Sequence, residues 1–354
     1  MKDLSSIINE SNKLVKRDTT IDAARGFAII LVVIGHSGVS SYWWNIIYFF
    51  HMPLFFFLSG CFLKPLDRPN ALLYLKRLKW KELYKNFVLY SIIFLLASPI
   101  LYKWGFSNTP IISVSDFVER LVLILRFRTS SIDLLGQFWF LPVLFFVHAL
   151  ALFTSPPPHW SRKRVLVISF VYYFIGRLCF INGYKEPYDF SRILYFAGFY
   201  LLGYYIYSYF NFVKTNIGLL VISLLIIAVS SLSPQVIYES SILYYCSAVS
   251  GIFITIFIST RLKGRIERCI SYIGKHTLEI FIFHCVSMKI IELGLSFGGF
   301  VTFSKGWSGS FSVNPYWWLY SIAGVAFPLL FLGFKSFLLR HLYHRNETFI
   351  HFKT

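Results

Sequence analysis

Charged residues are scarce in this 354-residue chain, and their scarcity excludes an ordinary soluble domain. Only 14% of the residues are charged, whereas 56% are hydrophobic and 20% are aromatic. The mean hydropathy of +0.62 is far above that of soluble proteins. The composition therefore predicts an all-α fold, a polytopic bundle of helices within a lipid bilayer.

Paired cysteines and a signal-peptide cleavage site are also missing. The five cysteines are scattered among apolar segments without any CxxC spacing, which predicts free thiols, no disulfide frame and no bound metal. The first twenty residues are polar and lack a short apolar core followed by small residues. We therefore interpret them as a cytoplasmic tail.

Acidic residues are few, 16 against 34 Lys and Arg, which gives a formal charge of +18. A nucleic-acid binder would gather its basic residues on a soluble face or motif, but here they lie between apolar runs. We therefore expect no nucleic-acid partner, and we read the charge as a record of membrane topology.

About ten apolar segments are long enough to cross a bilayer, which needs about 20 residues each. They cover approximately residues 20–41, 43–63, 86–104, 136–154, 165–182, 191–210, 216–233, 239–259, 270–291 and 316–338.

The basic residues between these segments alternate, as the positive-inside rule requires. One side of the predicted membrane carries twenty-three Lys and Arg, and the other carries six. This asymmetry predicts an even number of spans with both termini in the cytoplasm. It divides the chain into a cytoplasmic tail (1–19), a transmembrane domain (20–338) and a basic cytoplasmic tail (339–354).

The first predicted span carries three ionisable residues, Asp22, Arg25 and His36. A helix turns by about 100° and rises about 1.5 Å per residue, so Arg25 and His36 lie about 16 Å apart on nearly one face. Asp22 lies one turn before Arg25. Ionisable side chains inside a membrane are costly and mark functional sites.

Two further segments show unusual patterns. His51 lies early in the second span, near the expected depth of His36, and either joins a site or caps a helix end. Residues 72–84 mix apolar residues with a basic run that includes Arg77, as an amphipathic helix on the inner surface would. Such a helix could equally be an anchor for anionic lipids.

Five elements of the chain stand in a characteristic order: Asp22-x-x-Arg25-Gly with ten residues to His36, Phe50–Gly60, Tyr74–Arg77, Phe138–Leu144 and Ile273–His284. Together they resemble the membrane-bound acyltransferase 3 family, particularly its branch of sugar O-acetylase-like proteins. Thr277 stands where the family often has Ser, and residues 83–86 lack a common Pro. We expect this protein to work without the extracytoplasmic esterase-like domain that some members append.

This resemblance implies an acyltransferase in the cell inner (cytoplasmic) membrane. The donor would be an acyl-CoA, most commonly acetyl-CoA, with no metal. The acceptor would be a sugar hydroxyl of an envelope polysaccharide, such as a lipopolysaccharide or capsule, or of its lipid-linked precursor.

The residues suit this reaction. A histidine can remove the proton of a sugar hydroxyl, which makes His36 our predicted general base. Guanidinium groups bind phosphates well, so Arg25 and Arg77 are predicted to contact CoA. Asp22 can support Arg25 but lies too far along the helix to orient His36. A donor entering from the cytosol must then reach His36 through a channel.

Other residues are weaker candidates. Glu279 and His284 are ionisable groups in the ninth span and could be partners of His36. Trp139 could stack on a sugar or on adenine, or it could simply pack in the core. A transporter or flippase for lipid-linked sugars would share this composition, although the chain shows no paired broken helices or repeated halves. A membrane sensor or scaffold is a second alternative.

Overall fold

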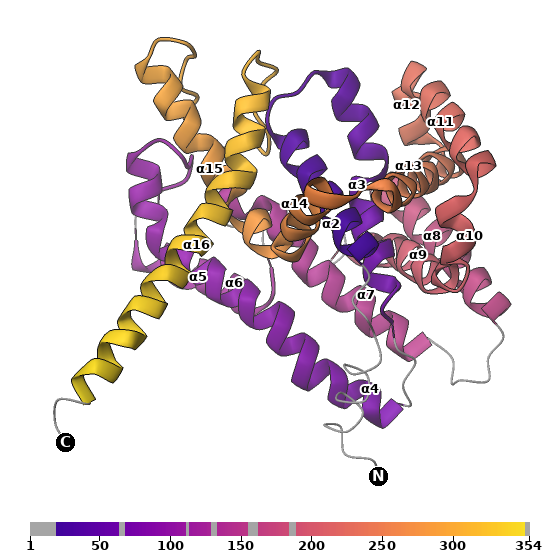
Figure 1. Cartoon of the computed structure of the whole chain (residues 1–354), viewed down its shortest axis with the longest axis horizontal. Coiled ribbons are helices and arrows are strands. Elements are labelled where there is room, and N and C mark those ends of the chain that lie inside the picture. The colour runs from indigo at the N-terminus through magenta and orange to yellow at the C-terminus, as the bar shows by residue number, and fades with distance from the viewer. Residues whose placement is uncertain are drawn as a thin grey trace.

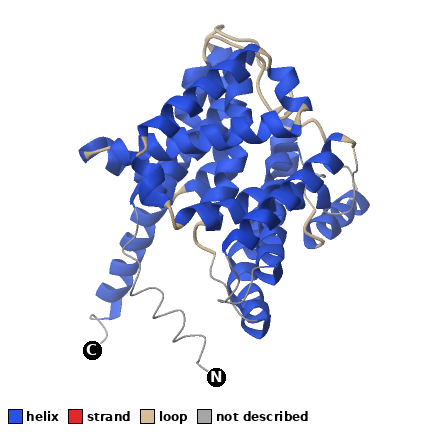
Figure 2. Ribbon diagram, turned by 90° about the vertical axis from the view of Figure 1, so that its right-hand side faces the viewer, coloured by secondary structure: helices blue, strands red, loops and turns tan. Residues whose placement is uncertain are grey.

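The computed structural model describes residues 19–63, 68–110, 113–128, 133–154, 162–183 and 189–350. Within these residues every regular element is a helix (Figures 1 and 2). The helices are α2 (Thr19–His36), α3 (Ser41–Gly60), α4 (Arg68–Tyr74), α5 (Lys85–Lys103), α6 (Val114–Leu125), α7 (Phe140–Thr154), α8 (Arg162–Ile181), α9 (Phe190–Tyr207), α10 (Phe210–Thr215), α11 (Ile217–Leu232), α12 (Pro234–Glu239), α13 (Ser241–Arg261), α14 (Gly264–Lys275), α15 (Thr277–Phe297) and α16 (Trp317–Ile350), with a π-helix, η1 (Leu75–Tyr84), and a 3-10 helix, η2 (Asp133–Trp139).

Each predicted span contains a helix, and seven helical segments of the described chain are long and apolar enough to cross a membrane. α3, α9 and α11 are not among these seven: α3 and α9 are continuous helices that contain many polar and aromatic residues, and α11 has only 16 residues. The structure therefore confirms an all-helical protein with several candidate membrane spans. The count of ten and the orientation of the termini stay predictions.

One predicted boundary is wrong. The expected span at 270–291 is divided at His276, where the amphipathic α14 ends and α15 begins. α14 packs against α2 instead of entering the span. A Cβ built on Gly274 of α14 would lie 1.8 Å from the carbonyl oxygen of Asp22, which shows how closely the two helices approach.

The basic segment, residues 72–84, does not form the separate amphipathic surface helix that its pattern predicts. Residues 70–103 form one continuous helical segment in which η1 joins α4 to α5. π-helical turns are uncommon and occur frequently at functional sites. Here side chains of η1 line a pocket.

α2 occupies the centre of the bundle and packs against α3, α13, α14, α15 and α16 (Figure 1). The α2–α3 turn, α12 and the connection between α15 and α16 lie at one end of the bundle, and α4 lies at the other (Figure 1). The two ends of α2 therefore belong to different faces of the molecule.

Candidate active site

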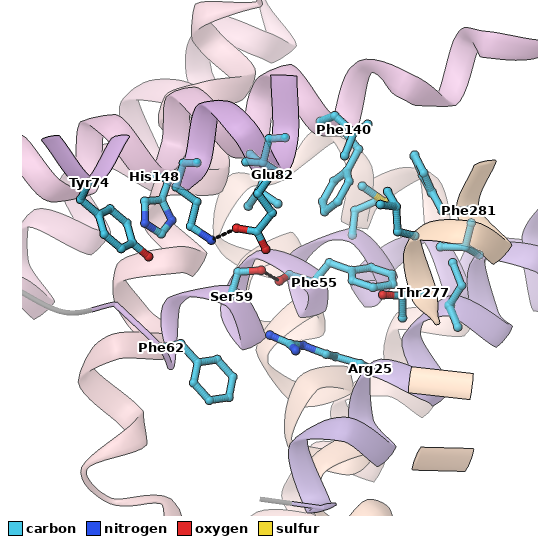
Figure 3. Close-up of a pocket in the computed structure, with 18 residues that line it drawn as sticks. Arg25, Phe55, Ser59, Phe62, Tyr74, Glu82, Phe140, His148, Thr277 and Phe281 are labelled. Atoms are coloured by element: carbon cyan, nitrogen blue, oxygen red, sulfur yellow. Dashed lines mark hydrogen bonds and ion pairs between the residues drawn. The ribbon is translucent and has the colours of Figure 1, made fainter. Parts of the chain in front are cut away.

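A pocket with a volume of about 290 Å³ lies between α2, α3, η1, α7 and α15. It follows one stripe of α2, because Arg25, Ile29 and Val32 line it in succession. Figure 3 shows Tyr74, His148 and Glu82 on one side of the pocket and Phe140 and Phe281 on the other. His36 does not line the pocket, but it comes four residues after Val32, about 6 Å further along the helix.

The polar part of the pocket is made by α2, α3, η1 and α7. Lys79 Nζ lies 2.7 Å from Glu82 Oε2, and the Arg25 guanidinium lies 5.0 Å from the centre of the Phe62 ring. His148 stacks on Tyr74 with ring centres 5.6 Å apart. Cationic groups beside an open pocket are suited to bind an anionic ligand.

The apolar part of the pocket points along the bundle toward His36. Three helices each contribute a lining residue to this part: Val32 on α2, Met52 on α3 and Phe281 on α15. Residues just beyond these on the same helices include His36, His51 and His284. The pocket therefore leads toward a group of histidines.

The ring centres of His36 and His284 are 5.4 Å apart. The ring centre of His51 lies 4.5 Å from that of Tyr48, which packs against Gly35 next to His36. His284 and His51 each use Nδ1 on a carbonyl of their own helix, at 2.9 Å from Phe281 and Ile47 respectively. Among the described residues no group of three or more His, Cys, Asp and Glu is placed to hold a metal ion.

The connection between α15 and α16, residues 298–316, lies over the end of α2, and we call it the strap. Phe311 N donates to His36 O at 3.1 Å, and Asn314 N donates to Gly38 O at 3.1 Å. His36 Nδ1 lies 2.5 Å from Gly309 O. Because a carbonyl can only accept, Nδ1 carries the hydrogen, and Nε2 of the neutral ring keeps its lone pair.

A buried ion pair anchors the strap to α15. Lys289 Nζ lies 2.8 Å from Glu292 Oε2, and both residues are at most 3% exposed. Ser304 of the strap closes the cluster, because its carbonyl accepts from Lys289 at 2.7 Å and its hydroxyl donates to Glu292 Oε1 at 2.7 Å. Buried charges need such complete pairing.

The structure brings His36, His51 and His284 together, and it places Arg25 in the pocket. The other predicted residues lie elsewhere. Asp22 is buried on α2 beside α14, Glu279 lies 3.8 Å from His276 at the start of α15, and Trp139 packs under the Arg192 guanidinium. The side chain of Arg77 lies outside the described residues.

Our sequence interpretation missed several residues of this region. His148 lines the pocket and lies 2.7 Å from the Tyr200 hydroxyl. The sequence did offer a signal for His148, because it is an ionisable residue in an otherwise apolar helix. Gly309 left no signal, because the contact uses a backbone carbonyl 273 residues away from His36.

Comparison with known families shows to which family the chain belongs. A family model described as an acyltransferase domain, acyltransferase 3, matches residues 18–333. The chain therefore belongs to the acyltransferase 3 family of membrane acyltransferases. None of the curated proteins and none of the solved structures matches the chain significantly.

Proposed function

We propose that this protein transfers an acetyl group from acetyl-CoA to a sugar hydroxyl of a cell-envelope polysaccharide or its lipid-linked precursor. The observation that carries the proposal is the pocket, which runs from Arg25 along one stripe of α2 toward His36. Its polar part suits a phosphorylated donor and its apolar part suits an extended acyl-bearing arm.

The donor phosphates bind at the polar end. Arg25 supplies a planar guanidinium, and Lys79 supplies an ammonium that Glu82 holds in place at 2.7 Å. Arg77, on the same basic segment, adds positive charge. Asp22 supports this end of α2. We place the end in the cytosol, with both termini inside and with the protein in the inner membrane, because CoA is cytosolic and the basic residues predict this side.

His36 acts as the general base. The hydrogen bond from Nδ1 to Gly309 leaves Nε2 as the proton acceptor, and Nε2 makes no hydrogen bond within the described residues. A hydroxyl oxygen that loses its proton to Nε2 can attack the acetyl carbon of the thioester. The wall between the pocket and His36, near Val32 and Phe281, has to open for the thioester to arrive.

The test is acetyl transfer by the purified protein in detergent. Radiolabelled acetyl-CoA is supplied together with the glycan fraction of membranes that express the chain, and label in the glycan is measured. We expect His36→Gln to lower turnover by about 10² to 10⁴. His276→Gln is the control, because His276 is a partly exposed histidine at the start of α15 whose own side chain does not line the pocket.

Turnover that survives His36→Gln would remove His36 from this role. If the wild-type protein transfers no label and the membranes contain no acetylated glycan, a transporter or flippase for a lipid-linked sugar becomes the better assignment. Mass analysis of the glycan with and without the gene identifies the acyl group and the acceptor.

A further inference from the structure

The indole nitrogen of Trp307 is a buried donor without a partner. Trp307 belongs to the strap and is 7% exposed, and its Nε1 has no hydrogen-bond partner among the described residues. Its ring centre lies 6.3 Å from that of His36. Buried polar groups are almost always paired, so an orphan beside a catalytic base needs a functional explanation.

The acyl transfer proposed above needs a hydrogen-bond donor close to His36. Attack on a thioester puts negative charge on the carbonyl oxygen, and enzymes stabilise that oxyanion with fixed N–H groups. The neighbouring histidines are not available in their neutral form. His36, His51 and His284 all have Nδ1 directed to a backbone carbonyl, which leaves each Nε2 as an acceptor.

We infer that Trp307 is a catalytic residue whose Nε1–H binds the oxyanion of the acyl group; this inference rests on the proposed function. The acceptor oxygen bonds to the acyl carbon while its proton passes to His36 Nε2. The carbonyl electron pair moves to the oxygen, which accepts from Trp307. When the carbonyl forms again, the C–S bond breaks and the CoA thiolate takes the proton from His36.

The strap holds Trp307 in place from two sides, which is the preorganisation that such a donor needs. On one side, Ser304 is bound by the ion pair of Lys289 and Glu292. On the other side, Gly306 N donates to Gly105 O at 2.7 Å and Asn108 Nδ2 donates to Trp307 O at 3.4 Å. These contacts fix the backbone at Trp307, and the buried indole itself packs edge-on against Phe311 with ring centres 5.3 Å apart.

The sharpest test changes one atom. Benzothienylalanine at position 307 keeps the shape of the indole but carries sulfur in place of the N–H. We expect kcat to fall by about 10² to 10³ while KM for acetyl-CoA stays unchanged, because Trp307 does not line the donor pocket. Trp307→Phe should lose at least as much. Trp318→Phe, on the half-exposed face of α16, is the matched control and should keep wild-type kcat.

The outcomes separate the two proposals. Wild-type kcat in the benzothienylalanine variant would overturn the role of Trp307 and leave the acetyltransferase intact. Absence of transfer by the wild-type protein would overturn the proposed function and this role with it. A fall in kcat matched by an equal loss of folded protein, measured by thermal unfolding, would show that the indole serves packing only and would also overturn the inference.

Discussion

The close approach of α3 and α9 gives a prediction whose size can be worked out from the structure. A Cβ built on Gly60 of α3 would lie 1.8 Å from Tyr200 O, and one built on Gly203 of α9 would lie 2.0 Å from Phe57 O. Each helix thus places a glycine against the backbone of the other. Such contacts stabilise helix pairs in membranes, where small residues let backbones approach.

Alanine at either position forces the helices apart. Ordinary contacts begin at 3.4 Å, so the backbones must separate by roughly 1.6 Å at Gly60 and 1.4 Å at Gly203 to admit one methyl group. Phe57 and Tyr200 are fully buried and leave no room for repacking. We expect each variant to lose about 1–3 kcal/mol of stability, as overpacked cores do.

The assay is unfolding of the purified protein by titration with SDS. Gly294→Ala is the matched control, because a Cβ there meets no atom within 4 Å, and it should be neutral or slightly stabilising. The double variant Gly60→Ala with Gly203→Ala should lose less than the sum of the single losses, because one separation admits both methyl groups. The close approach of α3 and α9 would be refuted if the single variants were as stable as Gly294→Ala. It would also be refuted if the losses of stability in the double variant were strictly additive.

Three further predictions concern the site. Val32→Trp should fill the apolar part of the pocket and abolish acetyl-CoA binding, measured by calorimetry, whereas loss of turnover with unchanged binding would contradict the position of the pocket. Arg25→Lys should raise KM for acetyl-CoA about tenfold with kcat unchanged, because lysine cannot make the bidentate phosphate contact of the guanidinium. Steady-state kinetics measure both constants, and an unchanged KM would count against Arg25 as a phosphate-binding residue. Lys289→Met should lower the free energy of unfolding by about 3–5 kcal/mol, because it leaves Glu292 buried and unpaired. The double variant Lys289→Met with Glu292→Leu should recover much of that loss in the same SDS titration. No recovery would disprove the charge argument.

The sequence predicted the helices well because apolar length alone specifies a membrane span. It failed at residues 270–276, the last turns of the amphipathic α14, which were read as the start of the apolar α15 because no proline marks the break at His276. It also predicts that His36 and Arg25 share one face, and α2 is indeed a continuous helix from Thr19 to His36.

The strap could not be predicted. Residues 298–316 have no hydrophobic period, and their function depends on backbone groups that every sequence carries. Lys289 and Glu292 are three residues apart on α15, a spacing that predicts an ion pair but not the hydrogen bonds of that pair to Ser304. Contacts between distant segments of the chain are set by packing of the whole bundle.

The attachment of the strap to residues 36–38 has a consequence for biosynthesis. The first described helix leaves the ribosome early, but the chain that binds its far end follows hundreds of residues later. Until that late segment has been inserted, His36 lacks the Gly309 carbonyl that fixes its tautomer. Under the proposed function, a nascent or truncated chain should therefore be catalytically silent until assembly is almost complete.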